Sequence, residues 1–350
     1  MKSVSVNASQ NYQVLIGSDL LCKLGSYASE IKSNCTAAII SDSNVWPIYG
    51  DAVSTSLDSS GIKTVHYVFP AGEASKNATT YLNILSFLAE NKITRSDLII
   101  ALGGGVVGDI TGFAAATYLR GISYIQVPTS LLAMVDSSVG GKTAIDLPAG
   151  KNLVGAFKQP CLVLCDIDTL NTLPMDLFLD GCAEVIKYGM LYDADLVQYL
   201  LKIGPGFDRE TVITKCVSFK RDVVQEDEFD TGSRQKLNLG HTVGHGIEAM
   251  SHYQITHGKA VAAGMAIVTK AAVARGLCSL ETYETLVRVL DRFSLPTHTE
   301  FCAEDLYHSA LSDKKRNGET VNMIIPRNIA HCEIMSMSIS EIESFIKVGL

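Results

Sequence analysis

The stretch LIIALGGGVVGDITGFAAATY, residues 98–118, decides the fold of the first half of this sequence. Leu98–Leu102 is uniformly apolar, as in a strand that is buried on both faces of a parallel sheet. Gly103–Asp109 then matches the pattern GxGxxG, and a helical pattern continues to Tyr118. Glycines in such a loop let the backbone approach a pyrophosphate, whose negative charge is favoured at a helix N-terminus. The stretch predicts a strand, a nucleotide-binding loop and a helix, although an ordinary glycine-rich turn also fits the loop.

Around this unit, short apolar runs alternate with amphipathic stretches. The apolar runs are Ala37–Ile40, Val65–Phe69, Leu98–Leu102, Tyr124–Val127 and Leu162–Leu164. Amphipathic stretches such as Tyr81–Glu90 and Ile110–Tyr118 lie between them, and this alternation predicts βα units with a mainly parallel sheet. Two earlier segments, Val4–Val6 and Gln13–Gly17, are expected to add a hairpin.

The pattern changes near Pro174, after which helical periodicity dominates. Helices are predicted at Asp195–Leu201, Thr211–Val224, Leu237–Met250, Lys259–Arg275 and Glu281–Phe293. Val321–Ile325 still resembles a strand. We therefore expect a Rossmann-like α/β domain over residues 1–175 and a mostly α-helical domain over residues 176–350. The active site is expected in the cleft between them, where ligands commonly bind.

The composition indicates packed domains of ordinary size. The chain has 350 residues, of which 47% are hydrophobic and 19% are charged. It has no apolar run of the roughly 18 residues that cross a membrane, and its first residues, MKSVSVNASQ, lack the apolar core of a secretion signal. Nine cysteines without a CxxC pair favour reduced thiols, so we expect a cytoplasmic protein. The net charge of −8 argues against nucleic-acid binding.

A second glycine loop, VGGKT at Val139–Thr143, resembles the end of a P-loop. The P-loop pattern requires an earlier glycine where this sequence has Asp136, so a nucleotide triphosphatase is excluded. Lys142 remains a candidate partner for a phosphate or a carboxylate. The acidic residue that usually follows GxGxxG is absent, which makes Asp42, after an earlier strand, the candidate for a ribose hydroxyl.

Four of the eight histidines, His241, His245, His252 and His257, fall within 17 residues. His241 and His245 are spaced i,i+4, so both imidazoles project from one face of a helix. Imidazole is a common zinc ligand, and the spacing alone favours His241 and His245 together with one acid. Glu184 and Glu248 are the candidate acids, and His257 competes with the pair. Surface or core histidines are the alternative, which the clustering disfavours.

Basic residues gather near these motifs in an otherwise acidic chain. They are Arg120, Lys142, Lys151, Lys187, Lys220, Arg234 and Lys314-Lys315-Arg316. Their association with glycine loops indicates a polyanionic ligand, although solvated surface charge is the usual fate of lysine. Solvated surface charge explains Lys187 less well, because this residue lies between Glu184 and Tyr188 in an otherwise apolar segment.

Six motifs together closely resemble the 3-dehydroquinate synthase family. In chain order they are GGGVVGDITGFAAATYLRG, QVPTSLLAMVDSSVGGKTAID, GKNLVGAF, GCAEVIKYG, NLGHTVGHGIEA and HGKAVAAGM. The resemblance extends from about Asp42 to about Gly318. It implies a lyase that converts 3-deoxy-D-arabino-heptulosonate 7-phosphate (DAHP) to 3-dehydroquinate and phosphate, the second step of the shikimate pathway. The family's route is transient oxidation by NAD, phosphate elimination, re-reduction, ring opening and aldol closure.

The resemblance also implies cofactors and a quaternary structure. Family members use NAD+ and one divalent metal, zinc or cobalt, and are homodimers. The NAD-binding α/β domain then corresponds to residues 1–175, and the helical domain binds metal and substrate. The family's metal ligands fall on Glu184, His241 and His257, which revises the assignment from spacing. His245 becomes a residue that handles protons or orients the substrate.

The remaining family positions fall on three sets. The cofactor set is Asp42, Asn44, Glu73, Lys76, Gly104, Gly105, Val106, Val107, Gly108, Asp109, Thr129, Ser130, Lys142, Lys151, Thr169, Leu170 and Thr172. The catalytic set is Lys187, His245, Asn152, Lys220 and Asp136. The substrate-binding set is Arg120, Lys142, Arg234, Asn238 and Lys314, with Lys314 favoured over Lys315. By the resemblance, Lys187, His245, Asn152 and Lys220 hold the substrate phosphate. Arg234 then meets the carboxylate, and Arg120 reaches the substrate of the neighbouring subunit.

Four departures from the family pattern leave the metal ligands intact. Asp146 replaces asparagine, Asp176-Leu177 replaces Arg-Glu, Asp230 replaces glutamate, and Lys259 stands where glutamate is common.

Three alternatives remain. Other sugar-phosphate cyclases, such as epi-valiolone or deoxy-inosose synthases, share the motifs, but Lys220, Arg234, Asn238 and Lys314 suit a substrate with a carboxylate. A metal-dependent alcohol or glycerol dehydrogenase would accumulate NADH. A non-catalytic binding protein should lack some of the polar site residues, and this sequence keeps them.

Overall fold

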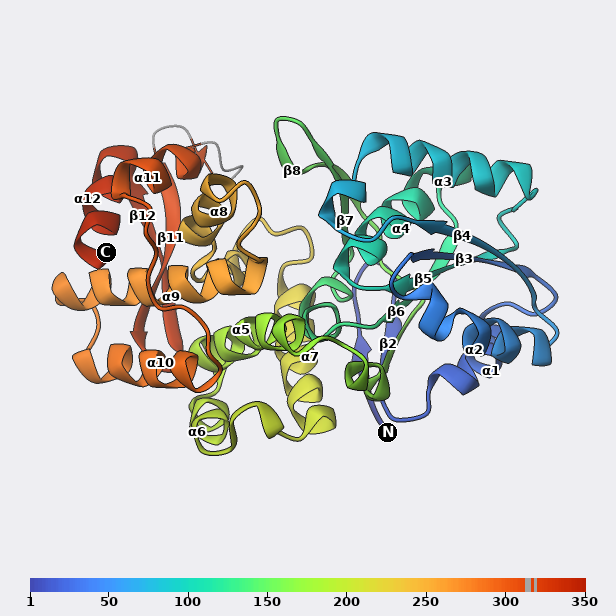
Figure 1. The fold of residues 1–350 in the computed structure, drawn as a ribbon, viewed down its shortest axis with the longest axis horizontal. Coiled ribbons are helices and arrows are strands. Elements are labelled where there is room, and N and C mark those ends of the chain that lie inside the picture. Colours follow the sequence, from blue (N-terminus) through green and yellow to red (C-terminus); the bar gives the residue numbers. More distant parts are fainter. Residues whose placement is uncertain (312–315, 318–319) are drawn as a thin grey trace. The chain divides into compact units, whose positions relative to one another are not determined.

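The computed structural model describes residues 1–311, 316–317 and 320–350. The chain forms two compact units, drawn in Figure 1. Unit 1 contains Met1–Pro174 and Arg209–Phe229, and unit 2 contains Met175–Asp208 and Asp230–Leu350. The expected division into residues 1–175 and 176–350 is thus wrong for Arg209–Phe229. This segment carries helix α7, which packs on the first two strands of unit 1.

Unit 1 is built on a seven-stranded sheet with the order β1-β2-β9-β6-β5-β3-β4. The strands are β1 (Lys2–Val6), β2 (Tyr12–Gly17), β3 (Thr36–Asp42), β4 (Lys63–Phe69), β5 (Leu98–Gly103), β6 (Ser123–Pro128) and β9 (Leu162–Asp166). β1 and β2 form the expected antiparallel hairpin, and the other neighbouring pairs are parallel. The Rossmann-like α/β prediction is therefore confirmed.

Helices cover both faces of this sheet. The helices of unit 1 are α1 (Leu24–Ile31), α2 (Trp46–Ser59), α3 (Ala78–Glu90), α4 (Gly105–Thr117) and α7 (Arg209–Glu226). Short helical segments are η1 (Leu21–Lys23), η2 (Glu73–Ser75), η3 (Tyr118–Arg120), η5 (Ile167–Asn171) and the π-helical η4 (Ala133–Ser137). A separate antiparallel hairpin consists of β7 (Lys142–Leu147) and β8 (Gly150–Phe157).

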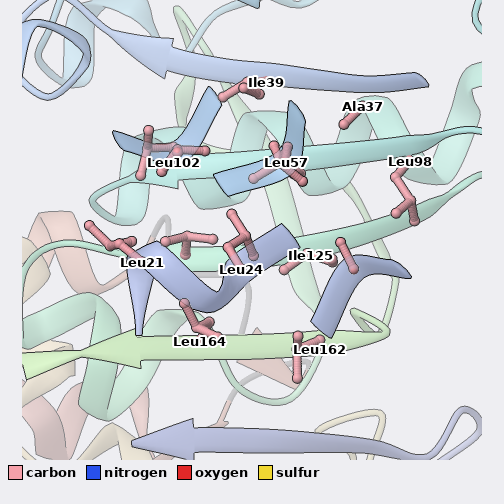
Figure 2. Packing of buried hydrophobic residues seen from close by; sticks show 14 of the residues in the cluster. Leu21, Leu24, Ala37, Ile39, Leu57, Leu98, Leu102, Ile125, Leu162 and Leu164 are labelled. Atoms are coloured by element: carbon pink, nitrogen blue, oxygen red, sulfur yellow. The ribbon is translucent and has the colours of Figure 1, made fainter. Parts of the chain in front are cut away.

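The uniformly apolar β5 is explained by burial on two sides. Leu98 and Leu102 pack with Leu24 of α1 and Leu57 of α2, as Figure 2 shows. The alternate residue Ile99 points into the opposite cluster, which contains residues of α3 and α4. Successive side chains of a strand face opposite sides, so a sheet with helices on both faces needs apolar residues at every position.

Unit 2 is mostly helical, as the sequence predicts. Its helices are α5 (Met175–Tyr192), α6 (Ala194–Ile203), α8 (His241–Met250), α9 (His257–Ala274), α10 (Leu280–Arg292), α11 (Ala303–Leu311) and α12 (Ile339–Gly349), with short segments η6 (Gly204–Gly206) and η7 (Ser233–Asn238). A small antiparallel sheet contains β10 (Arg316–Asn317), β11 (Thr320–Asn328) and β12 (His331–Ser338). The strand predicted at Val321–Ile325 is β11, whereas its partner β12 was not predicted.

The start of α8 differs from the predicted helix, which began at Leu237. Gly240 adopts a left-handed conformation with φ 78° and separates η7 from α8. A side chain at Gly240 would lie 2.7 Å from the Val261 carbonyl oxygen of α9, so this close packing also requires glycine. The break makes His241 the first residue of α8. Within the described part of the chain, no helix is both long and apolar enough to cross a bilayer.

Candidate active site

The glycine loop of unit 1 has the geometry of an anion site at a helix N-terminus. Gly104 is the N-cap of α4 and places no capping side chain over the first turn. A Cβ at Gly108 would lie 2.6 Å from Gln126 Oε1 on β6, so glycine permits close packing of the helix against the sheet. The polar first-turn N–H groups of an α-helix attract anions. This loop therefore fits the pyrophosphate of a dinucleotide.

Several expected cofactor residues lie at the carboxyl ends of neighbouring parallel strands. Asp42 ends β3, next to the end of β5, and its Oδ1 accepts hydrogen bonds from Asn44 N (2.8 Å) and Val45 N (3.0 Å). Thr129 follows β6 and donates its backbone N–H to Gly103 O at 3.0 Å. Ser130 comes next, and η5, which follows β9, contains Thr169 and Leu170. Ligands of open α/β sheets bind at this edge.

Lys76 connects several expected site residues through its buried ammonium. Its Nζ donates to Asp109 Oδ2 at 2.6 Å and to Asn152 Oδ1 at 2.5 Å. Burial alone would lower the pKa of Lys76, but the nearby carboxylates, above all Asp109, outweigh burial and raise it. Burial raises the pKa of Asp109 despite the charge of Lys76. Glu73 also belongs to this network, 4.0 Å from Lys76 Nζ and 3.6 Å from Lys151 Nζ.

Asp146, noted above as a departure from the family pattern, supports the same network. Its backbone N–H donates to Lys76 O at 2.7 Å, and its Oδ1 accepts from Asn152 N at 2.7 Å. Asn152 has a positive φ of 54°, a conformation that asparagine tolerates better than most residues. Asp146 was not among the predicted site residues. Its place as the last residue of the motif QVPTSLLAMVDSSVGGKTAID was the available signal.

Lys220 of α7 lies against Asp136 within unit 1. Its Nζ donates to the Asp136 backbone oxygen at 2.5 Å and to Asp136 Oδ1 at 2.8 Å. The sequence assigned Lys220 to the second domain, and that assignment is wrong because α7 packs with the first unit. The structure thus brings these two expected catalytic residues together.

In unit 2, two imidazoles and a carboxylate converge from three helices. Glu184 of α5, His241 of α8 and His257 of α9 each offer a ligand atom, and these atoms all lie within 4.8 Å of one another. Glu184 Oε1 is 3.5 Å from His241 Nε2 and 3.3 Å from His257 Nε2. Two nitrogens and one carboxylate oxygen form a donor set suited to zinc or a similar divalent cation.

A second group shares His257. It consists of His245, Glu248 and His257, whose ligand atoms also lie within 4.8 Å of one another. Burial alone would lower the pKa of His257, but hydrogen bonds to Glu184 and Glu248 outweigh burial and raise it to about 10. Two carboxylates thus favour positive charge at this imidazole. The sequence considered Glu248 as a ligand but did not predict its contact with His257.

Lys187 lies beside the first group. Its ammonium forms an ion pair with Glu184, and both side chains are almost fully buried. The His245 ring centroid is 5.5 Å from that of His241 and 6.2 Å from that of His257. Unit 2 therefore brings the three expected ligands together with Lys187 and His245.

The other expected substrate residues are more scattered. In unit 2, Arg234 is buried in η7 and Asn238 ends that segment. In unit 1, Lys142 and Arg120 are exposed. Lys314 lies outside the described residues, as does Lys315.

Arg120 lies in a turn with unusual backbone geometry. Leu119 has φ 50° and ψ 27°, and Arg120 has φ 63°. Arg95 donates from Nε (2.9 Å) and Nη2 (2.6 Å) to Leu119 O and so holds this turn. The sequence did not predict this role for Arg95, because no local pattern links the two segments.

Comparisons with known proteins agree with the motifs. The family model described as 3-dehydroquinate synthase N-terminal matches residues 66–180, and the C-terminal model matches residues 181–316. The chain is 42% identical over 344 residues to the 3-dehydroquinate synthase of Streptococcus suis (strain 05ZYH33), covering 96% of this chain and 97% of that protein. It is also 42% identical over 355 residues to that of Clostridium acetobutylicum, covering 99% of this chain and 100% of the relative.

A solved structure shows the same architecture. It is a 2-deoxy-scyllo-inosose synthase complexed with carbaglucose-6-phosphate, NAD+ and Co2+, which matches with a TM-score of 0.90 at 25% identity and full coverage of both chains. The two matched family models together span most of this sequence. The chain belongs to the 3-dehydroquinate synthase family.

Proposed function

We propose that this protein is a lyase that converts DAHP to 3-dehydroquinate and phosphate. The observation that carries the proposal is the convergence of Glu184, His241 and His257 from three helices, with the buried Lys187 beside them. Relatives at 42% identity over almost the whole chain bear the name of this activity. The matching cyclase structure, at 25% identity, bears the name of another. This difference favours DAHP over the substrates of other sugar-phosphate cyclases.

The proposed cofactors are NAD+ and one divalent cation, zinc or cobalt. When bound, NAD+ supplies a hydride acceptor that later returns the hydride, and the cation supplies stabilisation of a substrate alkoxide. The glycine loop would hold the pyrophosphate at the first turn of α4. Asp42, at the end of β3, would meet a ribose hydroxyl, and the network around Lys76 would support the rest of the nucleotide. The remaining assigned cofactor residues would complete this site.

The cation would be held by Glu184, His241 and His257. Glu184 is fully buried, and a buried carboxylate is stable only when opposite charges and hydrogen bonds compensate its desolvation. Lys187 supplies one such charge, and a divalent cation would supply another. Because Lys187 is fixed by Glu184, its ammonium would be positioned close to the cation ligands.

DAHP carries a phosphate and a carboxylate. The buried, positively charged side chains of Lys187, Lys220 and Arg234 suit such a substrate. Arg234 would meet the carboxylate, because guanidinium offers two parallel donors. Lys187, Lys220, Asn152 and His245 would hold the phosphate. Phosphate elimination needs a proton acceptor, and the phosphate of the substrate itself would serve, which leaves positioning and charge compensation to the protein.

The remaining assigned roles are proposals of the same kind. Asp136 would hold Lys220 in place, as their contact supports. Lys142, Asn238 and Lys314 would complete the substrate contacts. Arg120 would reach the substrate of a neighbouring subunit in a homodimer. A cytoplasmic location is supported by the nine cysteines, all at described positions and none of them in a disulfide.

The substrate is tested by a comparison of sugar phosphates. The purified protein, supplied with NAD+ and Co2+, is incubated with DAHP, sedoheptulose 7-phosphate or glucose 6-phosphate, and phosphate release is measured. We expect phosphate release with DAHP and not with the other two sugar phosphates. Faster release from either of the other two would instead identify another sugar-phosphate cyclase.

A further inference from the structure

The imidazole of His257 lies between two buried carboxylates. Its Nε2 is 3.3 Å from Glu184 Oε1, and its Nδ1 is 3.3 Å from Glu248 Oε2. The side chain of Glu184 is fully buried, and that of Glu248 is 3% exposed. Each ring nitrogen therefore faces a different carboxylate.

We propose that Glu248 is a positioning residue that orients His257 for the cation without binding the cation itself. This inference rests on the metal group proposed above. Metal-binding histidines commonly donate the second ring N–H to a carboxylate or a backbone carbonyl, which fixes the tautomer and the ring orientation. In the neutral imidazole that binds a cation, donation from Nδ1 to Glu248 leaves the lone pair at Nε2, on the side of Glu184.

His241 has the same arrangement with a different acceptor. Its Nδ1 is 3.1 Å from the Leu239 carbonyl oxygen, and its Nε2 is 3.5 Å from Glu184 Oε1. Both imidazoles thus direct Nε2 at Glu184 while Nδ1 contacts a hydrogen-bond acceptor. The acceptor at Nδ1 is a backbone carbonyl for His241 and Glu248 for His257. We infer that both acceptors orient their imidazole in the same way.

The backbone of His257 is fixed separately, which leaves ring rotation as the freedom that Glu248 restricts. Asp180 of α5 accepts hydrogen bonds from Lys259 N at 3.0 Å and from the Thr256 hydroxyl. These contacts hold the first turn of α9 on both sides of His257. Asp180 and Glu184 are spaced i,i+4 on α5, so one helix face anchors the backbone and supplies a ligand.

The alternative is that Glu248 is itself a ligand, in the group with His245 and His257. In that group two of the three residues come from α8, and Glu184 contributes nothing. The first group instead explains why both Nε2 atoms point at Glu184. The two arrangements make opposite predictions for His245, which belongs to the second group and not to the first.

The affinity for a divalent metal distinguishes Glu248 as a positioning residue from Glu248 as a ligand. We would remove metal from the full-length protein with a chelator and titrate Co2+, reading the dissociation constant and the visible absorption of the complex. Loss of an outer-shell partner typically weakens metal binding by about 10- to 100-fold. We expect a loss of that size for Glu248→Leu. Glu248→Gln should lose less, since its amide oxygen still accepts a hydrogen bond.

His245→Gln is the matched control, because it alters a neighbouring residue on the same helix. Under the proposal it keeps the Co2+ affinity and the absorption spectrum of the unaltered protein. Glu184→Gln tests the underlying metal group and should weaken binding more than Glu248→Leu does. Nitrogen-15 NMR of the zinc complex should show a protonated Nδ1 at His257 in the unaltered protein and in Glu248→Gln.

Each outcome has a distinct meaning. Unchanged affinity in Glu248→Leu, with loss in Glu184→Gln, would overturn the positioning role and leave the proposed metal group standing. Loss in both Glu248→Leu and His245→Gln, with none in Glu184→Gln, would overturn the metal group as well. If Glu248→Leu does not fold, Glu248→Gln and the NMR measurement decide the matter.

Discussion

Lys76 Nζ and Asp109 Oδ2 lie 2.6 Å apart, and this pair ties η2, after β4, to the helix that follows the glycine loop. The Lys76 side chain is 5% exposed and that of Asp109 is 18% exposed. The same ammonium also reaches Asn152, near the turn of the β7–β8 hairpin. The buried ammonium of Lys76 therefore connects segments that are assigned to cofactor binding and to substrate binding.

Replacing Lys76 with methionine should destabilise the protein, because it leaves the Asp109 carboxylate without the charge that compensates its burial. Removal of one partner from a buried ion pair costs roughly 3 kcal/mol. Urea unfolding measures this loss, and NAD+ titration should show weaker binding. The double variant Lys76→Met/Asp109→Leu serves as control and should recover part of the stability. A double variant that is less stable than Lys76→Met would contradict this account of the pair.

Much of unit 1 could be predicted because its signals are local. Strands buried on both faces, such as β5, need a continuous apolar run, and the hairpin of β1 and β2 shows in two short segments separated by a turn. Helix α7 was also predicted as a helix, but its membership of unit 1 was not. Periodicity identifies an apolar face without identifying the surface that covers it.

The site could be predicted only as a set of candidates. Spacing on α8 favoured His241 and His245 as paired ligands, since an i,i+4 pair is visible in the sequence. The structure instead turns Nε2 of His241 and of His257 towards Glu184 on α5. The contact between Glu248 and His257 joins two helices, and no sequence pattern reports which ring nitrogen faces which carboxylate.

Replacing Lys187 with alanine should reduce turnover without loss of metal. The ammonium is buried beside Glu184, and its proposed role is to compensate charge on the reacting phosphate. Loss of one catalytic hydrogen-bond donor often costs about 3 kcal/mol, or ~10²-fold in rate. Steady-state kinetics with DAHP and a metal analysis of the same sample provide the measurement. Near-normal turnover would refute the assigned role, and Lys187→Arg tests whether charge alone suffices.

Replacing Arg95 with glutamine should reduce activity through Arg120. Arg95 holds the carbonyl of Leu119 in a turn where two successive residues have positive φ. Small misplacements of a binding group can cost up to ~10²-fold in rate, and we expect roughly tenfold here. A double-mutant cycle with Arg120→Ala measures the coupling.

We predict that Arg95→Gln lowers the activity only in proteins that retain Arg120. Tyr118→Phe is the control, because it removes another hydrogen bond of the same turn, from the Tyr118 hydroxyl to Ile93 O at 2.9 Å. Additive losses in the Arg95 and Arg120 variants would show that Arg95 acts independently.

Replacing Asp97 with asparagine should destabilise unit 1 at neutral pH and have less effect in acid. Burial alone would raise the pKa of Asp97, but hydrogen bonds from Thr36 N and from Thr94 outweigh it and lower the pKa below its ordinary value of 3.8. The carboxylate therefore adds stability above the unfolded pKa. This stability is lost as the pH falls through the folded pKa.

We expect Asp97→Asn to lower the unfolding free energy by about 1.5–3 kcal/mol at pH 7, the scale of a hydrogen bond to a charged group. Circular dichroism with urea, at a series of pH values from 7 to 3, measures the difference between the two proteins. The difference should shrink towards pH 3. A difference that grows in acid would mean that the folded pKa is raised.

The proposed reaction oxidises and then reduces the same substrate. Its most direct test is one assay with DAHP and NAD+ at a concentration well below that of DAHP, in which phosphate and NADH absorbance are recorded together. We predict many phosphates released per NAD+, with no accumulation of NADH. Accumulation of NADH in proportion to product, or phosphate release that does not require NAD+, would contradict the account.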